Sequence, residues 1–343
     1  MPVVIAVDPR AHERASRDAL AEAARVLRAG GLVAFPTETV YGLGALAFDE
    51  GALARVFAAK GRPVHHPLIA HVEDEARARA LAASWPETAS RLARAFWPGP
   101  LTLVVDRGAH VPAAVSGGAS SIAVRVPSHP VALALLALLG QPIAAPSANR
   151  YQGVSPTTAA HVVKELGDRV DLVLDAGPCA AGIESTVVDA RLDPPRVLRL
   201  GAASLAALRR AAPGLRVRAD DAAAEAARAS PGMDARHYAP RARMMMASSR
   251  DAAVSLAREL VDATGEARGV SVGLVVHEPV SAREAEGLAL RRLPSEPSEY
   301  ARRLYGTLHD LDDAGARVIV VQAVPRDDEA WWAVADRLER GSR

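Results

Sequence analysis

The sequence predicts an α/β protein in which a mixed-sheet domain is followed by a smaller, Rossmann-like domain. Short apolar runs and helical patterns alternate over residues 1–212, which is typical of a sheet covered by helices. This regularity is lost over 213–241 and returns from Arg243, where strand and helix patterns alternate again. A chain of 343 residues is also long enough for two domains. We therefore expect domains at 1–212 and 242–343, joined by a linker at 213–241.

The elements expected in the first domain follow from periodicity and from residues that begin or end helices. Helical periodicity from Arg14 to Ala29 ends at two glycines, and Asp49 is a suitable N-cap for the next helix, which runs to about Ala59. The remaining expected elements are helices near 74–83, 87–95, 130–139 and 157–166, and strands at 32–35, 67–72, 101–105, 121–126, 143–145, 170–175, 185–189 and 196–200.

The segment 213–241 has the composition of a linker, with an acidic, alanine-rich stretch followed by Ser-Pro-Gly-Met and His-Tyr-Ala-Pro. An inert spacer needs neither His237 nor Tyr238, so we expect the linker to contact a ligand and to cover the first domain's site as a lid. Beyond it, the expected elements are strands at 243–247, 271–276, 288–293 and 317–321, and helices at 250–262, 281–286, 298–314 and 328–340.

The composition excludes several classes of protein. The formal net charge is +1, so any nucleic-acid binding must use a local basic patch. The one cysteine, Cys179, excludes a disulfide framework and a cysteine-based zinc site within the chain, and it fits a cytoplasmic location. The N-terminus does not have the pattern of a signal peptide. The longest apolar run, at 131–139, is far shorter than a bilayer-spanning helix, so no membrane association is expected.

The most informative segment runs from Gly31 to Gly44, where a short apolar strand leads into a turn rich in hydroxyl groups and glycine. Lys60 and Arg62 follow after one expected helix. Backbone N–H groups, hydroxyls and two cations suit an anionic ligand, with phosphate the first candidate. The alternative is a glycine-rich turn that only closes a strand, with both cations on a solvated surface.

Two further polar features accompany expected strands. Ser147 and Asn149 stand two residues apart after a buried strand, so in an extended backbone their side chains point the same way and suit phosphate oxygens or adenosine. Alternatively, they end the strand in a turn. Arg125 interrupts an apolar strand and needs a partner, which is either an internal carboxylate or the carboxylate of a substrate.

Other motifs carry less weight. The residues from Gly42 to Ala47 match the pattern G-x-G-x-x-A, but no acidic residue stands at the ribose-binding distance, so we do not expect a dinucleotide site. His65, His66 and His71 could be metal ligands, but loop histidines beside prolines are more often solvated or hydrogen-bonded. We expect no metal site made by protein side chains.

Taken in order along the chain, the motifs resemble those of the YrdC family. They comprise Pro-Thr-Glu-Thr-Val-Tyr-Gly-Leu-Gly, Lys60-Gly61-Arg62-Pro63, Pro67-Leu68-Ile69, Phe96-Trp97-Pro98-Gly99-Pro100-Leu101-Thr102, Val124-Arg125-Val126-Pro127, Pro146-Ser147-Ala148-Asn149, Ser155-Pro156-Thr157, Glu184-Ser185-Thr186-Val187 and Leu198-Arg199. Any single motif is weak evidence for the family, but this many motifs in the same order are specific to it. The linker motifs and the small α/β domain resemble the long, two-domain form of that family.

The resemblance implies a YrdC-like twisted mixed sheet and a nucleotidyltransferase. Such an enzyme joins L-threonine, bicarbonate and ATP into L-threonylcarbamoyladenylate and releases pyrophosphate. The product serves N6-threonylcarbamoylation of tRNA, so tRNA or tRNA-modification proteins are expected downstream.

The same resemblance implies the site residues. The catalytic, phosphate-handling residues are Lys60, Arg62, Ser147 and Asn149, with Mg²⁺ accompanying ATP. The other ATP-binding residues are Ser121, Ser155, Arg199, His237 and Tyr238. Threonine binding is expected at Thr37, His71, Arg125, Ser185 and the backbone of Ala145.

Two other functions stay open. One is an RNA-binding module of the same fold without synthase activity, since the family's sheet can form a basic concave surface. The other is the carbamoyl-transfer domain of hydrogenase maturation, but that class carries zinc-finger cysteines and this chain has one cysteine. Loss of ATP binding with RNA binding intact in a Lys60→Ala variant would favour the enzyme, and the reverse result would favour the RNA-binding module.

Overall fold

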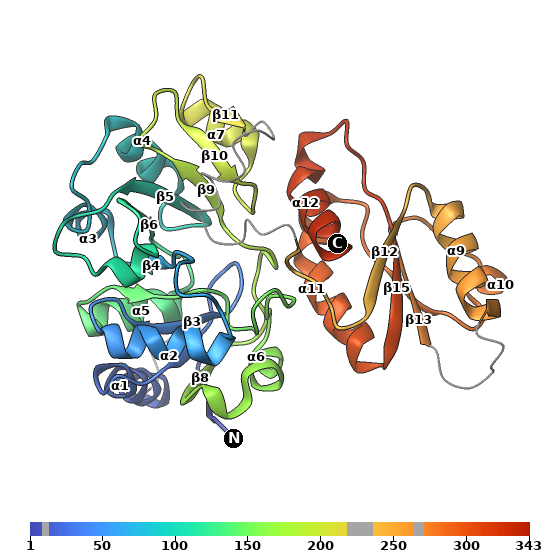
Figure 1. The fold of residues 1–343 in the computed structure, drawn as a ribbon, viewed down its shortest axis with the longest axis horizontal. Coiled ribbons are helices and arrows are strands. Elements are labelled where there is room, and N and C mark those ends of the chain that lie inside the picture. The colour runs from blue at the N-terminus through green and yellow to red at the C-terminus, as the bar shows by residue number, and fades with distance from the viewer. Residues whose placement is uncertain (9–13, 218–235, 264–270) are drawn as a thin grey trace. The chain divides into compact units, whose positions relative to one another are not determined.

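The structure is a computed structural model, and it describes residues 1–8, 14–217, 236–263 and 271–343. The chain divides into two compact units (Figure 1). The first unit comprises Met1–Tyr151 and Ser155–Met233, and the second comprises Gln152–Val154 and Asp234–Arg343. Within the described ranges, every helix is too short or too polar to cross a membrane.

The first unit is built on a mixed sheet with the strand order β1-β8-β2-β3-β7-β4-β6-β5-β9-β10-β11. Its strands are β1 (Val3–Ala6), β2 (Val33–Phe35), β3 (Gly42–Leu46), β4 (Ile69–His71), β5 (Leu101–Asp106), β6 (Ser121–Arg125), β7 (Ile143–Ala144), β8 (Leu172–Asp175), β9 (Thr186–Asp189), β10 (Arg196–Arg199) and β11 (Arg216–Val217). Its α-helices are α1 (Arg14–Arg28), α2 (Glu50–Lys60), α3 (Glu75–Ala80), α4 (Glu87–Phe96), α5 (Pro130–Leu139), α6 (Ala159–Leu166) and α7 (Leu205–Ala211).

One core cluster of this unit joins α1 and α5 to the sheet. Leu27 of α1 and Leu135 of α5 are fully buried together with Val33 of β2 and Ile143 of β7. The apolar residues of α1 recur at helical spacing, so they form one stripe that faces the sheet. α1 and α5 contact each other in this cluster.

The strand β3 is the main difference between the expected and the observed elements. The sequence predicted a turn through Gly44, and this prediction was wrong, because Gly42–Leu46 pairs with β2 on one side and β7 on the other. Glycine weakens a strand, but here it makes room for close packing. A Cβ atom on Gly44 would lie 2.8 Å from Ile143 Cγ2 and 2.8 Å from Phe35 Cε1. The hydroxyl-rich turn is therefore limited to residues 36–41.

The helix α2 begins and ends as the sequence predicts. The side chain of Asp49 accepts a hydrogen bond from the backbone N–H of Ala52 at 2.9 Å, which confirms it as the N-cap. Gly61 follows the helix with φ of 65°, a conformation that glycine adopts without strain. This ending places Lys60 in the last turn.

The second unit is a parallel sheet in the order β12-β15-β13-β14 with helices on both sides, which confirms the predicted Rossmann-like domain (Figure 1). Val254 and Ala257 pack on the sheet against Leu274 and Val320. The strands are β12 (Arg243–Ala247), β13 (Ser271–Val276), β14 (Ala289–Arg292) and β15 (Ala316–Gln322), and the helices are α9 (Arg250–Ala263), α10 (Ala282–Ala285), α11 (Pro297–Asp313) and α12 (Trp332–Gly341).

The expected linker at 213–241 lies mostly outside the described residues, because 218–235 are not described. Before this gap, β11 pairs with β10 and extends the first sheet to Val217. After it, Arg236 and the residues that follow belong to the second unit. The domain boundaries given by the sequence stay a prediction.

Candidate functional site

Several expected site residues lie on one face of the central strands. His71 of β4 is paired with Arg125 of β6, and the backbone N–H of Ala145, just after β7, donates to the carbonyl of Ile69 at 3.0 Å. Ser121 stands on the same face of β6 as Arg125, because alternate residues of a strand share a face. The same face carries a buried apolar cluster of Ile69, Val104, Ala123, Val187 and Leu198. Polar groups therefore stand at both ends of an apolar strip.

The turn 36–41 is held together by hydroxyl groups. Thr37 Oγ1 accepts hydrogen bonds from the backbone N–H groups of Thr39 and Val40, both at 3.2 Å. It also lies 2.8 Å from Thr39 Oγ1 and donates to the carbonyl of Val40 at 2.6 Å. Bonds of this kind between a side chain and nearby backbone fix a turn. Thr37 thus shapes the turn, and its contact with threonine stays a prediction.

Arg125 is buried, and three groups of the protein engage its guanidinium. Nη2 lies 2.8 Å from Oε1 of Glu38, Nη1 donates to Thr39 Oγ1 at 3.0 Å, and Nε donates to the carbonyl of Gly99 at 3.3 Å. Of the two partners left open by the sequence, the structure supplies the internal carboxylate. Sequence reasoning missed Glu38, although a buried arginine that needs a counter-charge and an acid in the adjacent motif were the available signals.

His71 is buried beside Arg125 and is neutral at ordinary pH. Its Nδ1 lies 3.1 Å from the carbonyl oxygen of Ile69, which can only accept, so Nδ1 carries the hydrogen. Its ring meets that of Phe35 edge-on, with centroids 6.0 Å apart. Burial, and after it the charge of Arg125, lower the pKa of His71 from 6.5 to about 3. An imidazole in this place offers a hydrogen bond but no charge.

We expect a His71→Asn variant to lose less stability than the wild type as the pH falls below 6.5. The unfolded chain binds a proton at His71 near pH 6.5, whereas the folded chain binds it only near pH 3. Acid therefore favours unfolding by up to about 1.4 kcal/mol per pH unit in this window. Urea unfolding of both proteins, at neutral pH and about two units lower, measures the effect. If the free energy of unfolding depends equally on pH in the two proteins, protonation of His71 in the folded protein costs no free energy.

Lys60 tethers the loop that follows β7. Its Nζ donates to the backbone carbonyls of Ser147 at 2.6 Å and Asn149 at 2.5 Å. The chain bends after Ser147, so the extended conformation considered from the sequence is not adopted. Ser147 is half-buried, while Asn149 is buried and donates from its amide nitrogen to the carbonyl of Arg150 at 2.7 Å. Lys60 and the two polar residues therefore do come together, as predicted.

The cations Lys60 and Arg62 are both buried and close enough to affect each other. Burial lowers the pKa of Lys60 well below its usual value, and the charge of Arg62 lowers it further. Arg62 donates from Nη2 to the carbonyl of Pro67 at 3.0 Å. An anion placed against this pair would favour the charged form of Lys60 and raise its pKa again. The arrangement suits a phosphate group better than a neutral ligand.

The remaining candidates of the first unit form hydrogen-bonded pairs near the start of β9. Ser155 Oγ donates to Oε1 of Glu184 at 2.6 Å. Ser185 Oγ lies 2.8 Å from Thr102 Oγ1, and Arg199 donates from Nη2 to the carbonyl of Ser185 at 2.9 Å. Sequence reasoning gave no role to Thr102 or Glu184, although both stand in the family's motifs. These contacts fix the backbone from which Ser185 projects.

His237 and Tyr238 are buried within the second unit. The Tyr238 ring lies 5.9 Å from that of Tyr305 and 5.0 Å from Cζ of Arg337, and the backbone N–H of His237 donates to the carbonyl of Arg340 at 3.2 Å. Tyr238 also has a positive φ of 61°, which is uncommon for a residue with a side chain. The contact of both residues with ATP stays a prediction, and most of the expected lid lies outside the described residues.

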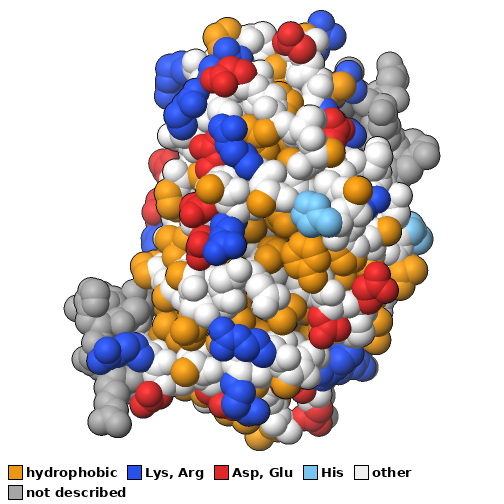
Figure 2. Space-filling view, turned by 90° about the vertical axis from the view of Figure 1, so that its left-hand side faces the viewer, with side chains coloured by type: hydrophobic (Ala, Val, Ile, Leu, Met, Phe, Trp, Pro, Cys, Tyr) orange, Lys and Arg blue, Asp and Glu red, His pale blue; other side chains and the backbone are white. Residues whose placement is uncertain are grey.

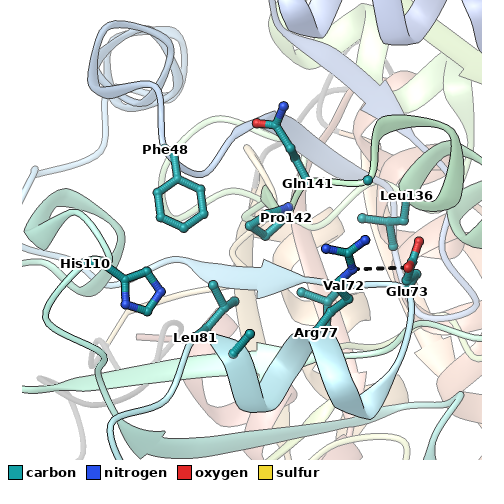
Figure 3. Close-up of a pocket in the computed structure, with 11 residues that line it drawn as sticks. Phe48, Val72, Glu73, Arg77, Leu81, His110, Leu136, Gln141 and Pro142 are labelled. Carbon is teal, nitrogen blue, oxygen red and sulfur yellow. Dashed lines mark hydrogen bonds and ion pairs between the residues drawn. The ribbon is translucent and has the colours of Figure 1, made fainter.

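A pocket of about 210 Å³ is lined by none of the candidate residues (Figure 3). Phe48 and His110 lie on one side of it, with ring centroids 6.2 Å apart, and Arg77 pairs with Glu73 at 3.3 Å on the other. The full lining is Phe48, Val72, Glu73, Arg77, Ala80, Leu81, His110, Leu136, Gly140, Gln141 and Pro142. Its one arginine is already paired, so this mainly apolar pocket does not suit a triphosphate.

Two family models match the chain. The model Sua5_yciO_yrdC, described as "Telomere recombination", matches residues 25–201. The model Sua5_C, described as "Threonylcarbamoyl-AMP synthase, C-terminal domain", matches residues 202–342. Together they match residues 25–342.

The chain is also similar to named proteins over nearly its whole length. It is 39% identical to the threonylcarbamoyl-AMP synthase of Pyrococcus abyssi, covering 100% of this chain and 98% of that protein. It is 34% identical to the threonylcarbamoyl-AMP synthase of Bacillus subtilis, covering 94% of this chain and 92% of that protein. The crystal structure of P. abyssi Sua5 complexed with L-threonine matches with a TM-score of 0.87 and 38% identity, over 99% of this chain and 97% of that one. The chain therefore belongs to the Sua5/YciO/YrdC family, in the form that carries the Sua5 C-terminal domain.

Proposed function

We propose that this chain joins L-threonine, bicarbonate and ATP into L-threonylcarbamoyladenylate and releases pyrophosphate and water. Full-length similarity to enzymes named for this product, and to a structure that contains L-threonine, supports the proposal. The observation that carries it is the presence of two buried basic side chains against the central strands. Arg125 lies on β6, and Lys60 holds the loop after β7, with only β4 between these strands. Two strand spacings, about 10 Å, suit an amino acid at one end and phosphates at the other.

The residues of the chain act by binding and neutralising charge. The carbamate oxygen of the threonine derivative attacks the α-phosphate, and negative charge grows on the departing pyrophosphate, opposite Lys60 and Arg62. Arg125 holds the carboxylate of threonine. Cys179 is a poor nucleophile, because burial raises the pKa of its thiol to about 12. No covalent intermediate with the protein is needed.

Mg²⁺ is expected to accompany ATP. The part of the chain that the structure describes has no group of three or more His, Cys, Asp or Glu that could hold a metal. Ser147 and Asn149 offer neutral oxygens only, while Lys60 and Arg62 offer positive charge. These side chains fit a Mg²⁺ ion that is held by the triphosphate and by water, and that neutralises phosphate charge.

The proposal includes supply of the adenylate to tRNA modification. Direct tRNA binding by an RNA-binding module without synthase activity is the competing function, and it requires a basic surface. On the side of the first unit where α3 lies, Figure 2 shows Lys and Arg mixed with Asp and Glu, and no continuous basic area. This face and the formal net charge of +1 therefore give no support to the RNA-binding module.

Incubation with labelled bicarbonate, L-threonine, ATP and Mg²⁺ tests the proposal directly. We expect a labelled adenylate and an equal amount of pyrophosphate, separated by chromatography. Omission of threonine serves as the control, since hydrolysis of ATP alone gives no labelled adenylate. Tight RNA binding with no adenylate in the complete mixture would favour the RNA-binding module instead.

An Arg125→Lys variant is expected to raise the KM for threonine. A lysine cannot bind a carboxylate in the bidentate manner of arginine, nor can it contact Glu38, Thr39 and Gly99 together. Initial rates at saturating ATP, with threonine varied, measure the change. An unchanged KM would mean that Arg125 serves only as the partner of Glu38.

A further inference from the structure

The carboxylate oxygens of Glu38 are buried, and their counter-charge is Arg125. Within the described residues, neither carboxylate oxygen of Glu38 accepts a well-directed hydrogen bond. Oε1 of Glu38 lies 2.8 Å from Nη2 of Arg125, and the two side chains form an ion pair. Burial raises the pKa of Glu38, but Arg125 and nearby backbone N–H groups outweigh it and keep the pKa below its usual value. Glu38 is therefore an anion, and an anion with unused acceptor capacity calls for a donor.

Arg125 is held firmly but retains donor capacity. Its Nε and Nη1 donate to the protein at Gly99 and Thr39, and its Nη2 faces Glu38 without a well-directed hydrogen bond. Arginine carries five N–H groups, so hydrogens remain on the terminal nitrogens for a carboxylate. The terminal N–H groups of Arg125 can therefore donate to a ligand, and the adjacent carboxylate oxygens of Glu38 can accept hydrogen bonds from it.

A carboxylate alone is a poor ligand for this pair. It would place two anions on one cation in a buried place, because Glu38 already occupies Arg125. Neighbouring His71 is neutral at ordinary pH and supplies no further positive charge. A ligand that brings its own cation together with its carboxylate avoids this cost.

We propose that Glu38 binds the α-ammonium group of the amino-acid substrate while Arg125 binds its carboxylate. The inference rests on the proposed function and adds to it a residue that recognises the amino group. The substrate's ammonium and carboxylate form two ion pairs beside the internal one, so every buried charge stays compensated. After the carbamate forms, its nitrogen keeps one N–H, which donates to the same carboxylate. Glu38 therefore selects a free amino acid over other small carboxylates.

The test compares two ligands on the full-length protein by titration calorimetry. The first is L-threonine, and the second is (R)-3-hydroxybutyrate, which keeps the carboxylate and hydroxyl of threonine but lacks the amino group. Wild type should bind threonine far more tightly. In Glu38→Gln, threonine binding should weaken about ten-fold or more, as expected for loss of a hydrogen bond to a charged group, while hydroxybutyrate binding stays the same or tightens.

Further variants separate recognition from a merely structural effect. Glu38→Asp keeps the charge and should retain more of the preference for threonine than Glu38→Gln. Asp171→Asn, which removes the carboxylate partner of Arg55 elsewhere in the first unit, should leave both affinities unchanged. Equal weakening of both ligands in Glu38→Gln would mean that Glu38 only positions Arg125, and it would overturn the inference. A wild-type protein that binds ATP but no L-threonine would overturn the proposed function as well.

Discussion

Replacing Lys60 with alanine is expected to lower the rate of adenylate synthesis at least ten-fold, with ATP binding weakened more than threonine binding. A cation opposite a transferring phosphoryl group typically contributes a few kcal/mol to transition-state stabilisation. The structure adds a second reason, because Lys60 Nζ also donates to the carbonyls of Ser147 and Asn149. Its removal frees the loop that is expected to hold the phosphates.

Lys164 supplies a matched control. It is the chain's only other lysine, and it is exposed on α6. Synthesis at saturating ATP and Mg²⁺, and the dissociation constants of ATP and L-threonine, are measured for Lys60→Ala, Lys164→Ala and the wild type. Lys164→Ala should behave as the wild type. A near-wild-type rate in Lys60→Ala at saturating ATP would refute the assignment of Lys60 to the phosphates.

Most elements of the fold were predictable because they depend on local patterns. The helix α5 is a continuous apolar run ended by a glycine, and α2 begins at a good N-cap. The strand β3 was not predictable in this way. Its glycines are required by Phe35 and Ile143, and the approach of Ile143 comes from a segment about a hundred residues away in the sequence. A single sequence does not show such an approach, so Gly44 was assigned to a turn.

Some contacts among the candidate residues were predictable from the sequence, but the atoms that make them were not. The motifs correctly indicated that Lys60 belongs with Ser147 and Asn149, yet its acceptors are backbone carbonyls, which no residue type reveals. The need of Arg125 for a counter-charge was also clear from its apolar strand. The choice of Glu38 depends on how the turn 36–41 folds over β6, which is a tertiary property.

A Gly201→Ala variant is expected to lower the free energy of unfolding by about 3 kcal/mol or more, because it forces two backbone segments apart. A Cβ atom on Gly201 would lie 2.4 Å from the carbonyl oxygen of Glu184, 2.4 Å from the carbonyl carbon of Ser185 and 2.5 Å from the nitrogen of Thr186. Backbone atoms cannot rotate away as a flexible side chain can. The strain falls on the segment that carries Ser185, so threonine binding should weaken in the protein that remains folded.

Gly51→Ala is the control for Gly201→Ala, since it adds the same methyl group in the first unit. The nearest atom to a Cβ on Gly51 is Oδ1 of Asp49 at 3.3 Å, the end of a side chain, and Gly51 lies in α2, where alanine is favoured. We expect this variant to be neutral or slightly stabilising. Urea unfolding gives both free energies, and calorimetry gives the affinity for L-threonine. Wild-type values in Gly201→Ala would show that the backbone at Ser185 moves aside without cost, and that its hydrogen bonds to Thr102 and Arg199 do not fix its position.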